Sequence, residues 1–204
     1  MNEKFFSLPA EKQQAILNAG YRVFSQNSYR KSPMSEIAVE AGISKSLLFH
    51  YFRNKKELYL YLWEKCAQIT IEYLTKYDCY GQRDLFESML RGMRAKMDII
   101  RQYPHMAFFT IKAFYEKDPE ICAAIQESCQ KHFSFKASST LLNLDPAQFV
   151  PGLDLKMMYR DMYWASEGYL WEMAQRGSID IEEMEREFTR MIGFWKSVYL
   201  RKEE

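Results

Sequence analysis

The chain has few cysteines, and their spacing is unlike that of a disulfide framework or a structural metal site. Its 204 residues include four cysteines and no CxxC pair. In a reducing compartment such residues are expected to be small buried or half-buried thiols. Cys122 and Cys129 are seven residues apart on one helical face, so redox sensing is an alternative. The four positions are Cys66, Cys79, Cys122 and Cys129.

Histidine is also scarce. The three histidines, His50, His105 and His132, have no metal-ligand spacing with each other or with cysteine. The sequence contains no phosphate-binding loop and no pairing of a nucleophile with a base. We therefore expect no bound metal, no cofactor and no enzymatic activity.

Long apolar runs and strand patterns are missing. No run approaches the ~20 residues that span a bilayer, and the N-terminal MNEKFFSLPAEKQQ lacks the apolar stretch of a signal peptide. Helical periods continue to the end of the chain, without the alternation typical of strands. These absences predict an all-α, cytoplasmic protein without a membrane partner.

The charge is unevenly distributed. The whole chain carries 28 Lys and Arg against 27 Asp and Glu, a net charge of +1. Residues 1–60 carry nine basic and five acidic residues, net +4, whereas residues 61–204 carry 19 and 22, net −3. The basic N-terminal part suits a phosphate-rich partner such as nucleic acid, although +4 alone would be unremarkable.

A pair of short helices is predicted between residues 34 and 51. Met34, Ile37, Ala38 and Ala41 recur at helical spacing and predict one apolar face. Gly42 suits the left-handed position after a helix, and its turn leads to Ser44 as the cap of the next helix.

The second helix of the pair, Lys45 to Tyr51, has the composition of a DNA-reading helix. Leu48 and Phe52 are four apart and would face the first helix. The other side chains of the helix carry a cation, hydroxyls, an imidazole and apolar groups, which suit contacts in the major groove of DNA. The side chains expected to approach bases are Lys45, Ser46, Leu47, Phe49 and His50.

A third helix is expected from Asn54, because Asn54 and Glu57 have the spacing of a capping box. Its free N–H groups and Lys55 would form a phosphate clamp beside the reading helix. The residues expected to hold phosphates are Ser32, Ser35, Ser44, Tyr51 and Lys55.

Less specific interpretations compete with this one. A helix pair around a glycine turn is common in all-α proteins. His50 could be an ordinary surface histidine, and Phe49 could be partly core. Arg53 and Lys56 are better read as solvated charges.

The segment AGISKSLLFHYFRNKKEL, with ILNAGYRVFSQNSYRKSPMSEIA before it, resembles the signature of the tetracycline-repressor (TetR) family. The likeness covers roughly the first 60 residues and implies DNA binding, a helical ligand domain and a dimer. Phe49 stands where the family usually has a tyrosine that can reach a phosphate, and Ser46 where glycine is common. The matching positions are Ala15, Phe24, Ile37, Ala38, Ala41 to Ser44, Tyr51, Phe52 and Lys55.

The remaining sequence predicts further helices, about nine in all. Their expected ranges are 10–26, 55–76, 84–102, 106–115, 118–142, 153–176 and 181–201, with a loop at 143–152. We divide the chain into a helix-turn-helix domain, residues 1–54, and a ligand-binding and dimerisation domain, residues 55–204.

The last two helices are candidates for a two-fold dimer interface. Their apolar stripes are wide, and helix-turn-helix proteins usually need two reading heads about 34–36 Å apart on DNA. The alternative is burial within one subunit. The expected dimer contacts are Met162, Tyr169, Met184, Phe188, Met191 and Trp195.

The larger domain is rich in methionine and aromatic residues, which suit an adaptable apolar pocket. Glu167 among aromatic residues could attract a lipophilic cation, or could be a surface or interface charge. The candidate ligand contacts are Met93, Met97, Phe109, Phe114, Phe133, Tyr163 and Glu167.

Together these patterns predict a homodimeric transcriptional regulator that binds a near-palindromic double-stranded DNA operator, and we favour a repressor over an activator. A small hydrophobic or lipophilic-cationic effector would release it. The alternatives are a DNA-binding dimer that recruits a protein partner, and an all-helical enzyme.

Overall fold

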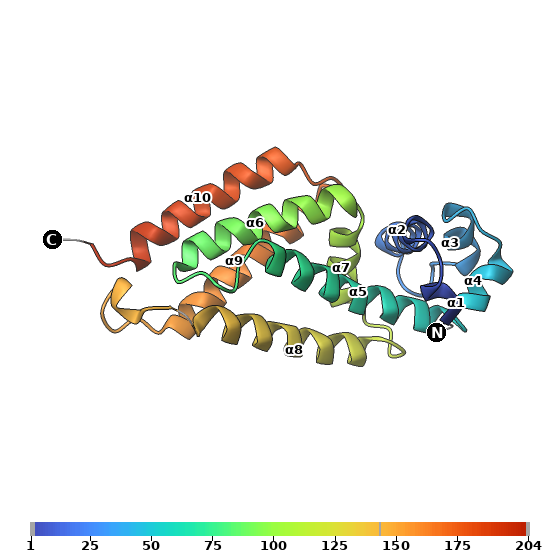
Figure 1. Ribbon diagram of the computed structural model, residues 1–204, viewed down its shortest axis with the longest axis horizontal. Coiled ribbons are helices and arrows are strands. Elements are labelled where there is room, and N and C mark those ends of the chain that lie inside the picture. Colours follow the sequence, from blue (N-terminus) through green and yellow to red (C-terminus); the bar gives the residue numbers. More distant parts are fainter. Residues whose placement is uncertain (1–2, 143, 203–204) are drawn as a thin grey trace. The chain divides into compact units, whose positions relative to one another are not determined.

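The computed structural model describes residues 3–142 and 144–202, without the side chains of residues 133–139. Ten α-helices and one short 3-10 helix occupy these residues, and no strand occurs among them (Figure 1). The helices are α1 (Glu3–Phe6), α2 (Ala10–Gln26), α3 (Met34–Glu40), α4 (Lys45–Tyr51), α5 (Lys55–Lys76), α6 (Leu85–Gln102), α7 (Met106–Tyr115), α8 (Cys122–Leu141), η1 (Pro146–Gln148), α9 (Leu155–Gln175) and α10 (Ile181–Tyr199). The predicted all-α fold is confirmed.

The chain forms two compact units. The first comprises Met1–Ile69 with Ile100–Gln130, and the second comprises Thr70–Ile99 with Lys131–Glu204. Helices α1 to α4 therefore share a unit with α7 and the start of α8, which follow them by many residues in the sequence. The division predicted at residue 54 follows the sequence motif and not these compact units.

The core of the first unit is aromatic. Phe109 of α7 lies 5.4 Å from Tyr21 and 5.1 Å from Tyr59, measured between ring centroids, and Phe24 lies 4.8 Å from Tyr59. All four rings are buried. Edge and tilted contacts between rings add to the free energy of burial. They join α2 to both α5 and α7.

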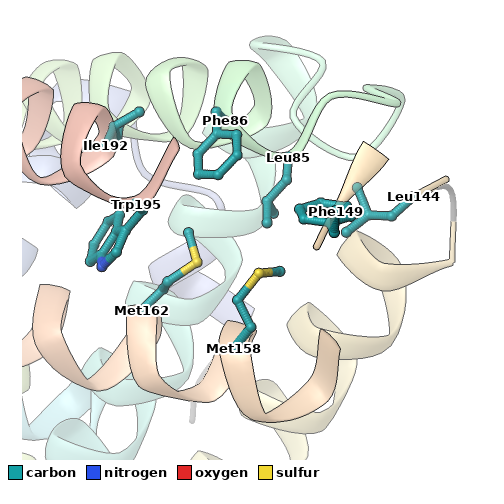
Figure 2. Packing of buried hydrophobic residues seen from close by; sticks show 8 residues of the cluster. All are labelled: Leu85, Phe86, Leu144, Phe149, Met158, Met162, Ile192 and Trp195. Carbon is teal, nitrogen blue, oxygen red and sulfur yellow. The ribbon is translucent and has the colours of Figure 1, made fainter. Parts of the chain in front are cut away.

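The second unit has a core of mixed aliphatic, aromatic and thioether side chains. Figure 2 shows them gathered from α6, the segment around η1, α9 and α10. Methionine fills irregular gaps in such a core because its side chain is unbranched and flexible. The cluster consists of Leu85, Phe86, Leu144, Phe149, Met158, Met162, Ile192 and Trp195.

A short backbone pairing fixes the end of α10 to the segment after η1. Phe149 and Leu200 form an antiparallel bridge. The Val150 amide donates to the Tyr199 carbonyl at 3.0 Å, and the Arg201 amide donates to the Gln148 carbonyl at 2.9 Å. These bonds satisfy carbonyls at the end of a helix.

Most helix boundaries agree with the sequence patterns within two residues. One predicted helix start was wrong. The helix expected from Asp118 begins at Cys122, because residues 119–121 form a turn that the Asp118 side chain caps at the Glu120 amide. The loop expected at 143–152 contains η1, capped by Asp145. Helix α1, only four residues long, was not predicted because it is too short to show a period.

Residues 3–142 and 144–202 lack two features that would indicate other classes of protein. No helix among them is long and apolar enough to cross a membrane. Within the same residues, no group of three or more His, Cys, Asp or Glu side chains could hold a metal ion.

Candidate nucleic-acid interface

The turn between α3 and α4 has the geometry that its sequence predicts. Gly42 adopts φ +67°, a left-handed conformation that glycine takes without strain. The amides of Gly42 and Ile43 donate to the carbonyls of Val39 and Ala38, each at 3.0 Å. The Ser44 hydroxyl accepts from the Leu47 amide at 3.1 Å and caps α4. These bonds fix how α4 leaves the turn.

The inner side of the helix pair is buried. Ile37 on α3 and Leu48 and Phe52 at α4 are fully buried, as their spacing predicts. Phe5 of α1 lies 5.1 Å from the ring of Phe52 and 6.0 Å from the ring of Tyr51. Helix α1 therefore packs against the C-terminal end of α4.

The outer side of α4 is open. Leu47 and Phe49 are large apolar residues with 37% and 39% of their surface exposed. Lys45 Nζ lies 5.9 Å from the centroid of the Phe49 ring, within reach of a cation–π contact. A cation, two hydroxyls, an imidazole and two apolar side chains thus share one helix face. The exposed residues from Ser44 to His50 are Ser44, Lys45, Ser46, Leu47, Phe49 and His50.

Two of the expected phosphate contacts are not on the surface. Ser32 is fully buried, and its hydroxyl donates to the Ser28 carbonyl at 2.9 Å, where it closes the turn after α2. Tyr51 is 6% exposed because its ring packs against Phe5. Ser32 and Tyr51 thus pack within the chain, whereas Ser35 and Ser44 are exposed, and the phosphate contacts of all four stay predictions.

The start of α5 has half of the expected capping box. The Asn54 side-chain oxygen accepts from the Glu57 amide at 2.8 Å, as predicted. The Glu57 carboxylate accepts from the Arg53 amide at 2.7 Å instead of the Asn54 amide. Asn54 therefore caps α5, and the Glu57 carboxylate binds the backbone of Arg53, the residue before Asn54.

Lys55 is held within the protein. Its ammonium donates to the Arg30 carbonyl at 3.0 Å and lies 4.7 Å from the centroid of the Tyr29 ring. An ammonium has three donors, so these contacts leave capacity for a phosphate. Arg30, to which the sequence patterns gave no role, is 76% exposed in its side chain and adjoins Lys55 through this bond.

Nothing in the local sequence marks Arg30. Its ion-pair partner is Asp118, with 2.5 Å between Nε and Oδ2, and the two residues are 88 positions apart. The adjacent Tyr29 is buried, and burial raises the pKa of its phenol, with the carboxylates of Glu120 and Asp118 adding to the shift.

The candidate ligand contacts are divided between the two units. Phe109 and Phe114 belong to the first, where Phe109 is core and Phe114 is 42% exposed. The Phe133 side chain lies outside the described residues. A single cavity lined by these residues stays a prediction. The members in the second unit are Met93, Met97, Tyr163 and Glu167.

Glu167 has a partner in the same unit. Its carboxylate lies 3.8 Å from Lys96 Nζ, and both side chains are about one-third exposed. Lys96 also lies 5.8 Å from the centroid of the Phe188 ring. Glu167 is thus a partly exposed carboxylate with a cation of this chain beside it.

Most of the expected dimer contacts are core residues of a single chain. Met162, Met184, Phe188 and Trp195 are buried, and Tyr169 and Met191 are half-buried. The sequence shows a wide apolar stripe but not which part of it the same subunit covers. The four buried residues pack within the chain, and their contact with a second copy stays a prediction.

Other large apolar side chains of α9 and α10 are exposed. On α9, Met157, Trp164 and Trp171 recur every seven residues, with exposed fractions of 45%, 53% and 43%. On α10, Phe194 and Val198 are 63% and 45% exposed. Residues seven apart lie on one side of a helix, so these three side chains share a face of α9, with Arg160, Asp161, Glu167 and Gly168 at the positions between them.

Comparison with known proteins gives a consistent result. The family model described as "Bacterial regulatory proteins, tetR family" matches residues 16–62, which contain α3, α4 and the turn between them. The chain is 32% identical over 146 residues to the fatty acid metabolism regulator protein of Bacillus subtilis, covering 72% of this chain and 75% of that protein.

Other relatives align with the chain over fewer residues or share only its fold. The transcriptional regulator AcrR of Shigella flexneri is 30% identical over 71 residues, which span 33% of each protein. The solved structure of the fatty acid degradation regulator FadR from Bacillus halodurans superimposes with a TM-score of 0.71 at 15% identity. That superposition covers 91% of this chain and 95% of the other.

Proposed function

Because the chain belongs to the tetR family of bacterial regulatory proteins, we propose that it is a transcriptional regulator that binds an operator through α4. The observation that carries the proposal is the open face of α4, where a cation, hydroxyls and apolar groups occur together. Lys45, Ser46 and His50 would contact base edges, and Leu47 and Phe49 would contact thymine methyl groups. Ser35, Ser44 and Lys55 would bind phosphates.

We further propose that the protein acts as a homodimer on a near-palindromic operator. A two-fold pair of reading heads matches two half-sites about 34–36 Å apart. The exposed stripe of α9 with Phe194 and Val198 supports the proposal, since large aromatic residues at a surface are typical of protein interfaces. This face replaces the buried residues that the sequence suggested.

The protein is proposed to be a repressor that a small hydrophobic effector releases. An effector that prefers the conformer with wrongly spaced reading heads weakens DNA binding, and DNA weakens effector binding by the same factor. We prefer a hydrophobic effector to a lipophilic cation, because Glu167 already lies beside Lys96.

The relative in Bacillus subtilis is named a fatty acid metabolism regulator protein, and this supports a role for our protein in controlling genes of fatty acid metabolism. The methionine- and aromatic-rich composition of the chain agrees with an acyl chain as part of the effector.

The deciding experiment measures binding of the purified protein to its own upstream intergenic DNA and to scrambled DNA of equal length, across a salt series. Tight binding to the native fragment that weakens steeply with salt is expected. His50→Ala is expected to reduce the preference for the native fragment. Lys31→Ala, on the turn before α3, changes an exposed residue outside α4 and is expected to leave that preference unchanged.

Equal, weak binding to both fragments would contradict an operator in that region, and selection of bound fragments from the whole genome would then test for a distant one. Effector binding is tested by thermal shift with palmitic acid and with tetraphenylphosphonium. Stabilisation by the acid alone supports the hydrophobic effector, and stabilisation by the cation alone contradicts it. Absence of both shifts would favour a protein partner, and turnover of a metabolite without DNA binding would favour an enzyme.

A further inference from the structure

Two carboxylates on the turn between α7 and α8 reach the turn between α2 and α3. The Glu116 carboxylate accepts from the Tyr29 amide at 2.8 Å, and Asp118 Oδ2 accepts from Arg30 Nε at 2.5 Å. All four residues belong to the first compact unit. Two adjacent residues of one turn are thus bonded to two acidic residues of another.

Asp118 differs from an ordinary surface partner. Its side chain is 5% exposed, although that of Arg30 is 76% exposed. Its other oxygen, Oδ1, accepts from the Glu120 amide at 3.0 Å. The Glu120 amide and the Arg30 guanidinium both lower the pKa of Asp118, so this carboxylate stays charged near neutral pH.

Lys55 also contacts the turn to which Glu116 and Asp118 are bonded. The Lys55 ammonium donates to the Arg30 carbonyl at 3.0 Å, and its cation lies over the Tyr29 ring. Tyr29 is buried and lies 5.2 Å from the ring of Tyr59 on α5. The residues before α3 therefore have contacts with both α5 and the α7–α8 turn.

Capping alone does not explain this arrangement. One oxygen of Asp118 is sufficient for the Glu120 amide, and the second is directed to Arg30. The Glu116 carboxylate also accepts from the Lys117 and Asp118 amides at 3.0 and 3.2 Å, which fixes the turn that presents Asp118. An isolated exposed ion pair contributes little, whereas a buried, multiply bonded carboxylate holds a geometry.

We propose that Asp118 is a positioning residue for DNA recognition. Through Arg30 it fixes the turn that leads into α3, and through the Arg30 carbonyl it fixes Lys55 at the start of α5. The entry to the helix pair and its phosphate-binding lysine are thereby held in one arrangement. The proposal rests on the proposed function, because it specifies how the reading head is positioned.

The test uses Asp118→Asn, Arg30→Gln and the double variant of the full-length protein. Asparagine retains an oxygen for the Glu120 amide but removes the charge that binds Arg30. Affinity is measured for the operator fragment and for scrambled DNA across a salt series, with helix content by circular dichroism. Glu11→Gln, which removes an exposed acid of α2, is the control for net charge.

Asp118→Asn is expected to reduce the operator-to-scrambled affinity ratio about tenfold, and Arg30→Gln is expected to do the same. The double variant should be no worse than either single one, because both remove the same contact. Glu11→Gln should leave the ratio unchanged.

Other results overturn the proposal. Asp118→Asn could instead bind both DNAs more tightly by the same factor, as Glu11→Gln does. That result would mean that Asp118 acts only by its charge. An unchanged ratio in a folded variant would mean that the contact does not position the helix pair. If Asp118→Asn loses helix content, Arg30→Gln decides, since it leaves the cap intact. Wild-type protein that binds no fragment selected from the whole genome more tightly than scrambled DNA would refute the proposed function itself.

Discussion

The reading helix α4 and the α9–α10 pair both expose large apolar side chains, but in different surroundings. On α4, Leu47 and Phe49 alternate with a lysine, serines and a histidine. On α9, Met157, Trp164 and Trp171 form a stripe at intervals of seven residues. Mixed chemistry suits a groove with polar base edges and methyl groups, whereas large apolar side chains that recur along one helix face suit a protein interface.

The two regions also differ in what lies beneath the exposed face. Helix α4 has seven residues, and its packing depends on Leu48 and on neighbours from α1 and α3. Helices α9 and α10 have 21 and 19 residues and contribute four of the eight members of the second unit's core. A short helix should therefore be more sensitive to one core substitution than the long pair.

The largest expected effect compares a buried residue of α4 with an exposed one. Leu48→Ala should destabilise the protein by about 2 to 5 kcal/mol, because Leu48 is fully buried and a cavity remains. The adjacent residue Leu47, which is exposed, is the matched control. Leu47→Ala should change stability by at most about 0.5 kcal/mol. Thermal unfolding measures both, and similar losses for the two variants would contradict the orientation of α4.

The next effect tests the apolar stripe of α9. Trp164→Ser should weaken the proposed dimer by about 2 kcal/mol, as at an aromatic hot spot, and should reduce operator affinity with it. Lys156→Ser, also exposed on α9, should leave the association unchanged. Sedimentation velocity gives the oligomeric state. A Trp164→Ser protein that associates like the wild type would mean that α9 is not in the interface.

A smaller effect concerns phosphates. Lys55→Ala should weaken binding to operator and scrambled DNA alike, and should reduce the slope of log affinity against log salt by about 1. Lys56→Ala removes an adjacent exposed charge that does not contact Arg30, and it should change the slope less. If Lys55→Ala changed only the preference between sequences, Lys55 would not be a phosphate ligand.

Features that depend on a few adjacent residues were predicted well. Gly42, Ser44 and Asn54 have the backbone conformation or capping bond expected of them, because turns and caps are decided within about four residues. The bounds of α4 and α5 follow from the same signals. Sequence was therefore sufficient for the helix pair and for its exposed face.

Features that depend on distant contacts were missed or misplaced. The contact of Arg30 with Asp118 joins residues 88 positions apart, and the local pattern at Asp118 predicts only the start of a helix. Tyr51 was expected at the surface, but Phe5 of the unpredicted α1 covers it. Met184 and Trp195 belong to an apolar stripe wide enough to serve a core and an interface together, so periodicity could not assign them.

The smallest expected effect compares two buried thiols with two half-buried ones. Burial raises the pKa of the Cys66 thiol to about 12 and that of Cys79 to about 11, whereas Cys122 and Cys129 are half-buried. Because the thiolate is the reactive form, a thiol reagent at pH 8 should label Cys122 and Cys129 first. Mass spectrometry of the labelled peptides identifies the sites, and Cys122→Ser should remove one early label without loss of stability.

Raised pKa values also predict that stability falls above about pH 8.5, where unfolded thiols lose protons that the folded protein retains. Cys66→Ala should make that alkaline decline shallower, and an unchanged decline would mean that Cys66 keeps an ordinary pKa in the folded protein.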